Sequence, residues 1–150
     1  MKKLKFILIL LIAATSFSYA QSNAEPSFDQ LIAKKAKYKA IFQLNSGDEK
    51  VIESTMKNIV NSMAETKLKG QLKVELVVHG NGVLIFKKGN PFEKQVLDLK
   101  DKGVILVQCL NTLKNKNIAK DQLFPFIYYV ESGVAEIIYR QHQGWAYVHP

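Results

Sequence analysis

Cys109 is the strongest candidate for covalent chemistry in this sequence of 150 residues, because it is the only cysteine. It follows an apolar run and precedes the segment Leu110-Asn111-Thr112-Leu113, so the pattern places its sulfur where a strand passes into a short helix. The partial positive charge of a helix N-terminus favours the nucleophilic thiolate. The thiol is therefore either free and reactive or paired with another molecule. The alternative interpretation is a small buried side chain that ends a core strand.

The segment His79-Gly80-Asn81-Gly82 is a second candidate, because it ends another apolar run. Its glycines permit positive φ angles and a close backbone approach to a bound group. A functional His79 would bind an anion or shuttle a proton to the thiol. The alternative is a structural histidine that is hydrogen-bonded within a tight turn.

Other site types find little support in the sequence. The glycines do not complete G-x-G-x-x-G, since Ile85 occupies the last position, and there is no P-loop. His142 and His149 lack the spacing of zinc ligands, so we expect no metal and no cofactor. There is no G-x-S-x-G elbow, and a lone cysteine cannot run a dithiol cycle. A protease pair of Cys109 and His79 would lack an orienting acid at a known spacing.

The elements that must position these residues follow from apolar runs that alternate with amphipathic stretches. Runs of strand length, rich in β-branched or aromatic residues, span residues 39–44, 74–78, 103–108 and 126–130, and a brief last strand is expected over 145–148. The segment 80–89 is ambiguous between a helical turn and a short extra strand.

Helices are predicted between these strands. The first begins at Ser46, which has capping-box spacing to Glu49, and Gly70 closes it. The second runs from Asn90 to Gly103, and a shorter one follows Cys109. The last begins at Ser132 and ends at residue 144.

This alternation predicts a three-layer α/β/α sandwich with a mostly parallel five-stranded sheet and right-handed crossovers. Ligands of such folds bind beyond the carboxyl ends of the strands. The candidate residues all follow strands at that edge, and the order of the strands is left open.

The first 20 residues resemble a cleaved export signal. Three lysines precede an apolar run over residues 6–14 and a small-residue site at Ser18-Tyr19-Ala20. The run is too short to span a membrane, and no second long one follows. We therefore expect an exported protein, periplasmic or secreted, with a linker or loosely docked arm over residues 21–36 and one domain over 37–150.

The charge of the chain argues against nucleic acid as a partner. The formal net charge is +8, but part of it belongs to the export signal, and Arg140 is the only arginine among 21 basic residues. Nucleic-acid-binding proteins present arginine-rich surfaces, whereas these lysines are scattered among acids.

Aromatic side chains near the end of the chain can pack on the sheet or line a subunit interface; they are Tyr128, Tyr129, Trp145 and Tyr147.

Several motifs, in this order, resemble the DsrE/DsrF-like family. They are Val77-Val78-His79-Gly80-Asn81-Gly82, Gly103-Val104, Cys109-Leu110-Asn111-Thr112-Leu113, Ser132-Gly133-Val134-Ala135-Glu136 and Gln141-His142-Gln143-Gly144-Trp145-Ala146-Tyr147. The resemblance covers residues 38–150. It implies a parallel α/β/α fold, assembly into trimers or hexamers and, in some relatives, a cysteine that carries sulfur as a persulfide.

The resemblance gives Cys109 the role of accepting a sulfane sulfur and passing it to a second thiol. His79 and nearby backbone amides, in our own interpretation, would assist the anion. The sulfur-relay members of the family are cytoplasmic, so an exported chain leaves donor and acceptor open. Two alternatives remain: a non-catalytic binding module anchored by His79, Asn81 and Asn111, and an assembly subunit without a ligand.

Overall fold

The computed structural model describes residues 27–150, and the predicted export signal lies outside them. Five strands form one sheet in the order β4-β3-β2-β1-β5, and every neighbouring pair is parallel. Their bounds are Tyr38–Leu44 (β1), Leu72–Val78 (β2), Ile105–Cys109 (β3), Tyr128–Val130 (β4) and Ala146–Val148 (β5). The prediction of an α/β fold with a parallel five-stranded sheet is confirmed.

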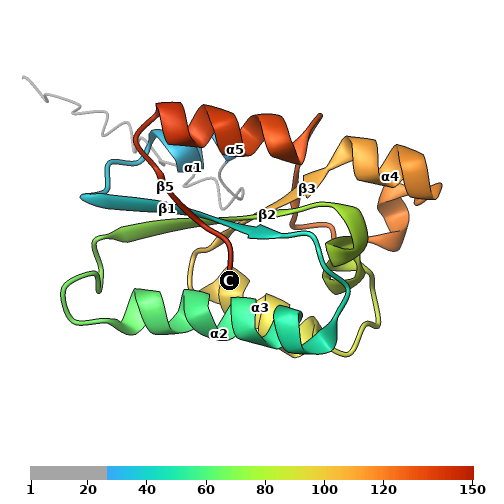
Figure 1. Ribbon diagram of the computed structural model, residues 1–150, viewed down its shortest axis with the longest axis horizontal. Coiled ribbons are helices and arrows are strands. Elements are labelled where there is room, and N and C mark those ends of the chain that lie inside the picture. The colour runs from blue at the N-terminus through green and yellow to red at the C-terminus, as the bar shows by residue number, and fades with distance from the viewer. Residues whose placement is uncertain (1–26) are drawn as a thin grey trace, which may run out of the picture.

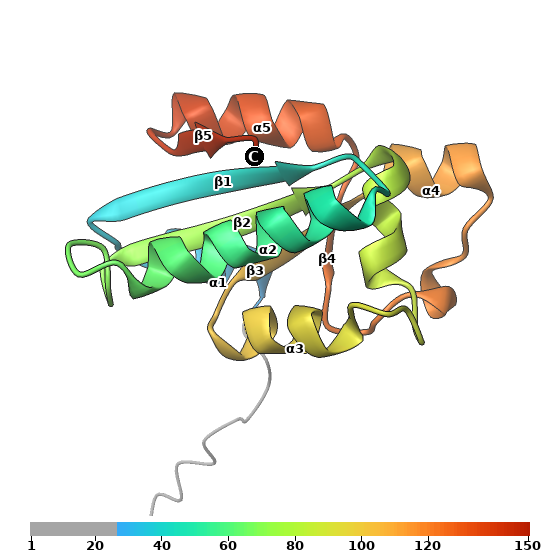
Figure 2. The ribbon, with the colours of Figure 1, turned by 60° about the horizontal axis from the view of Figure 1, so that its bottom comes forward.

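Helices cover both faces of the sheet (Figures 1 and 2). Helices α1 (Phe28–Ala33) and α5 (Gly133–His142) lie on one face, and α2 (Glu49–Ala64) and α3 (Glu93–Asp101) lie on the other. Helix α4 (Leu110–Lys116) lies at the end where the strands finish. The ambiguous segment contains a 3-10 helix, η1 (Gly80–Phe86), and a second one, η2 (Lys120–Gln122), precedes β4. No helix among residues 27–150 is long and apolar enough to cross a membrane.

Alternation along the strands divides the core into two layers. Side chains such as Phe42, Leu76 and Leu106 pack against α2 and α3, together with Ile59 and Leu99. Their strand neighbours face α5 in a smaller cluster, whose buried members are Ile41, Val77, Ile105, Val107, Ile137 and Trp145. Burial on both faces explains why the strands are near-continuous apolar runs.

The helices were predicted in the right places, but not all of their ends were: α2 ends at Ala64 and not near Gly70, and α3 begins at Glu93 and not at Asn90. Ser132 caps α5, since its hydroxyl accepts a hydrogen bond from the Ala135 N–H. The prediction that the first long helix begins at Ser46 was wrong, because α2 is capped by Asp48, whose carboxylate accepts from the Val51 N–H. A carboxylate at the N-cap satisfies a free amide and also opposes the helix dipole.

Part of the arm before the first strand is a docked helix. Ser27 and Gln30 form a reciprocal capping box at the start of α1. Phe28 packs against the smaller cluster, with its ring centroid 5.5 Å from that of Tyr128. The ammonium of Lys73 donates to the carbonyl oxygens of Leu31 and Ile32 near the end of α1. These contacts hold α1 against the sheet.

Candidate functional site

Cys109 ends β3 and directly precedes α4. Its exposed fraction is 6%, and its Sγ lies 3.7 Å from the carbonyl oxygen of Glu131, which follows the neighbouring strand β4. Among the described residues, neither hydrophobic cluster includes this cysteine. The side chain is thus nearly covered, but it lies at the carboxyl edge of the sheet next to polar groups.

His79 lies beside Cys109, because β2 and β3 are paired and both residues stand at the ends of these strands. Gly133, the first residue of α5, fits against both of them. A Cβ atom at Gly133 would lie 3.3 Å from the His79 Cβ and 3.4 Å from the Cys109 Cβ. The structure therefore brings together the thiol, the imidazole and the start of α5.

Two side chains that the sequence did not reveal extend the site: Gln43 contacts His79, and Tyr147 contacts Gln43. The Nε2 atom of Gln43 in β1 lies 2.8 Å from the His79 Nε2. The hydroxyl of Tyr147 in β5 donates to the Oε1 atom of the same glutamine. Burial lowers the pKa of His79, and the charge of His149 lowers it further, so the imidazole of this half-buried site is neutral at pH 7.

The glycines of the second candidate segment approach the protein's own backbone. Gly80 has a φ of +55°, and its N–H donates to the Thr112 Oγ1 at 3.0 Å. A Cβ atom at Gly82 would lie only 2.5 Å from the carbonyl oxygen of Leu44. These contacts hold η1 against the end of β1 and the first turn of α4, and so fix the backbone that follows His79.

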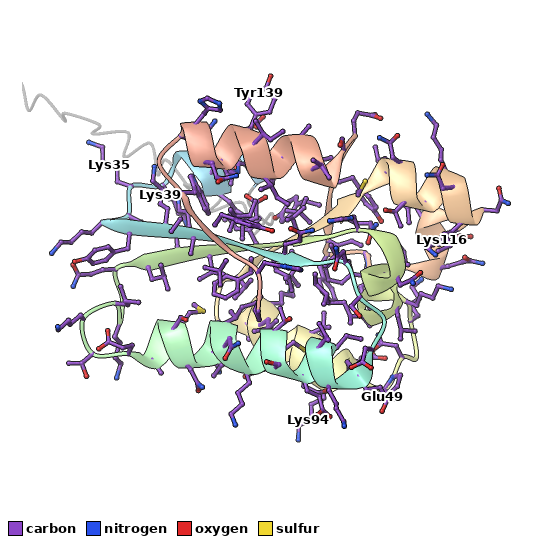
Figure 3. The ribbon with its side chains drawn as sticks, viewed as in Figure 1. Lys35, Lys39, Glu49, Lys94, Lys116 and Tyr139 are labelled. Carbon is purple, nitrogen blue, oxygen red and sulfur yellow. The ribbon has the colours of Figure 1, made fainter. Side chains whose placement is uncertain are left out.

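Among the described residues, the side chains of the two predicted asparagine anchors make no hydrogen bond to the thiol. The Oδ1 atom of Asn81 accepts a hydrogen bond of 2.8 Å from the Lys116 ammonium on α4, a side chain that points away from the sheet (Figure 3). Asn111 is exposed, and its backbone N–H donates to the same Glu131 carbonyl that Cys109 contacts. Among residues 27–150 we find no group of three or more His, Cys, Asp or Glu side chains that could hold a metal ion.

The polar side chains of the site were predictable only in part. His79 was found because it ends an apolar run next to two glycines. Gln43 carries a weak signal, a polar residue one position before the end of a buried strand. Tyr147 carries none, because its contact with Gln43 depends on the pairing of β5 with β1.

The comparisons with known proteins agree with this architecture. The model of the DsrE/DsrF-like family matches residues 39–150. The chain belongs to the DsrE/DsrF-like family. It is also similar to a solved structure, that of MTH1491, a protein of unknown function from Methanobacterium thermoautotrophicum. The two are 31% identical with a TM-score of 0.71, and the match covers 75% of this chain and 99% of that one. No curated protein matches this chain.

The DsrE/DsrF-like domain accounts for every residue of the candidate site. Gln43, His79, Cys109, Gly133 and Tyr147 all lie within the matched segment. The resemblance seen in the sequence motifs is thereby confirmed at the level of family and fold. Because one fold supports many functions, the role of this family member depends on the residues of its site.

Proposed function

We propose that this protein is exported and carries sulfane sulfur as a persulfide on Cys109. The observation that supports this most is the position of the only cysteine, at the carboxyl edge of a DsrE/DsrF-like sheet and beside His79 and Gly133. Thiol–disulfide chemistry requires an attacking thiolate and a leaving thiol, and no further cysteine of the chain is needed when both substrates are separate molecules.

The transfer is an exchange of one S–S bond for another. Cys109 first gives its proton to solvent, and its thiolate attacks the outer sulfur of a donor persulfide. The S–S bond of the donor breaks, a new one forms at Cys109, and the donor leaves as its thiolate. An acceptor thiolate then removes the outer sulfur in the same way. No net oxidation or reduction occurs.

The low exposure of Cys109 restricts the size of the donor. Sγ is covered by the turn that leads into α5, so a bulky donor needs a local opening of that turn before it can reach the sulfur. We therefore expect an inorganic polysulfide to load Cys109 faster than a persulfide carried on a folded protein.

Loading with polysulfide tests this function directly. The chain without its predicted signal should gain the mass of one sulfur atom per protomer in intact-mass spectrometry, and excess thiol should remove it. Cys109→Ser is the matched control, because it removes the only cysteine. It should show no gain while its melting temperature stays near that of the wild type.

A wild-type protein that gains no sulfur would refute the carrier function. The remaining candidate would then be the binding module, for which Cys109→Ser leaves ligand affinity unchanged.

Export is tested separately. Expression of the full chain in a bacterial host should yield a periplasmic product that begins near residue 21, and an uncleaved chain would contradict export.

An assembly role is favoured by the exposed apolar surface of α5. Val134, Ile138 and Tyr139 are all exposed, the last by 67%, and Tyr139 points away from the sheet (Figure 3). Apolar patches of this kind mark protein–protein contacts. We therefore expect the mature chain to form a homo-oligomer through α5, and the family resemblance implies a trimer or hexamer.

Sedimentation at micromolar concentration checks the assembly. The double variant Ile138→Glu/Tyr139→Glu should shift the protein towards monomer, because each carboxylate would lose its hydration in the contact. Leu97→Glu is a matched control, since Leu97 is an exposed apolar residue of α3 on the opposite face. A monomeric wild type would contradict the assembly role.

A further inference from the structure

A hydrogen-bonded chain of three side chains crosses the sheet and ends at His79. Strand β1 lies between β2 and β5, so Gln43 stands between His79 on one side and Tyr147 on the other. The Gln43 amide uses both of its ends: Oε1 accepts from the Tyr147 hydroxyl, and Nε2 lies 2.8 Å from the His79 Nε2.

The chemistry of the amide determines which ring nitrogen of His79 carries the proton. An amide nitrogen can only donate, so the His79 Nε2 facing it must be the acceptor. A neutral imidazole has one acceptor nitrogen, and its proton is then on Nδ1. Protonation of His79 would place an Nε2–H group against the N–H of the Gln43 amide. This contact therefore opposes protonation of the ring, as its burial also does.

We propose that Gln43, oriented by Tyr147, is a positioning residue that holds His79 as the neutral Nδ1–H tautomer. The occupied Nε2 cannot take a proton from Cys109, so His79 contributes to the site as a hydrogen-bond donor through Nδ1 and is not the base of the thiol. The tautomer is inferred from the contacts of Gln43 with His79 and Tyr147 alone, whereas the role of His79 toward Cys109 rests on the proposed function.

The ring nitrogens of His79 report the tautomer without any activity assay. In ¹⁵N NMR spectra of the labelled protein, His79 should show a protonated Nδ1 and an unprotonated Nε2 at pH 7. Its signals are assigned by their loss in His79→Gln, which separates them from those of His142 and His149. A protonated Nε2 in the wild type would overturn the proposal.

Gln43→Glu is the informative variant, because it replaces the donor with an acceptor of the same length. The carboxylate should bind an Nε2–H proton, switch the tautomer and raise the pKa of His79 by about one unit or more. Tyr147→Phe removes only the outer hydroxyl, and should mix the two tautomers without raising the pKa in this way. An unchanged titration of His79 in Gln43→Glu would also overturn the proposal.

The thiol gives a second readout. The rate at which a small alkylating reagent modifies Cys109 should rise with pH in a single step in the wild type, because His79 does not titrate with it. Gln43→Glu should add a second step at the pKa of its His79. A second step already present in the wild type would show that His79 acts as the base. If the NMR spectra show the expected tautomer but polysulfide does not load Cys109, only the carrier function is refuted.

Discussion

Replacing Arg140 with methionine is expected to lower the free energy of unfolding by about 3–5 kcal/mol at pH 8. The Nε atom of Arg140 lies 2.7 Å from the Glu75 Oε2, and its Nη2 atom lies 2.6 Å from the Glu136 Oε1. Glu75 is fully buried, and the exposed fraction of Arg140 is 5%. The variant would leave two carboxylates without the guanidinium that neutralises them. Methionine keeps apolar volume between Phe28 and Trp145, whose rings each lie 5.3 Å from the guanidinium.

The loss of free energy of unfolding in Arg140→Met should be smaller at pH 5 than at pH 8. Burial raises the pKa of Glu75 to about 7, against the opposing attraction of Arg140, and the charge of Glu136 adds to the rise. At pH 5 the Glu75 carboxyl of the variant is therefore neutral and needs no counter-ion. Urea unfolding followed by circular dichroism at both pH values measures the difference. Equal losses at pH 5 and pH 8 would contradict this account.

Glu75→Gln is the matched control for the titration, since its amide copies the size and neutrality of the protonated acid. Wild-type Glu75 binds its proton more tightly in the folded than in the unfolded chain. The stability that this proton contributes is fully present below the pKa of Glu75 in the unfolded chain. It is lost as the pH rises through the pKa of Glu75 in the folded protein. Between pH 4.5 and 7 the wild type should lose up to about 3 kcal/mol relative to Glu75→Gln. Parallel pH curves would show that Glu75 does not titrate there.

The sequence predicted what depends on neighbouring residues. Apolar runs located the strands, Ser132 located the start of α5, and Cys109 was correctly placed between a strand and a helix. The sequence did not distinguish between two helix N-cap residues that lie within a few positions of each other. Ser46 and Asp48 are both good N-caps, and the structure uses Asp48 for the cap while the Ser46 Oγ accepts from the Asp48 N–H.

Contacts that depend on the strand order were beyond the sequence. Glu75 is a charged residue in a buried strand, and its partner Arg140 lies 65 positions away. Gln43 and Tyr147 are 104 positions apart and meet only because β5 pairs with β1. Periodicity assigns each of these residues to a face of its own element, but it carries no information on which strands are neighbours. The polar groups around the site therefore required the fold.

Gly82→Ala is expected to destabilise the protein by about 2–3 kcal/mol and to disturb the site at the same time. The new Cβ would lie 2.5 Å from the Leu44 carbonyl oxygen, and backbone cannot move aside as a flexible side chain can. The same oxygen accepts a hydrogen bond of 3.0 Å from the His79 N–H. The methyl group must therefore push apart the end of β1 and the 3-10 helix η1, and with them the backbone that holds His79.

Gly47→Ala is the matched control, because a Cβ there would meet the neighbouring Asn81 Cβ at the more tolerable distance of 3.3 Å. It should change the melting temperature little and leave the ring signals of His79 in place. Gly82→Ala should lower the melting temperature and shift those signals even well below unfolding. If Gly82→Ala left both unchanged, the glycine would not be needed for the close approach, and a role in contacting a bound group would become the better explanation for it.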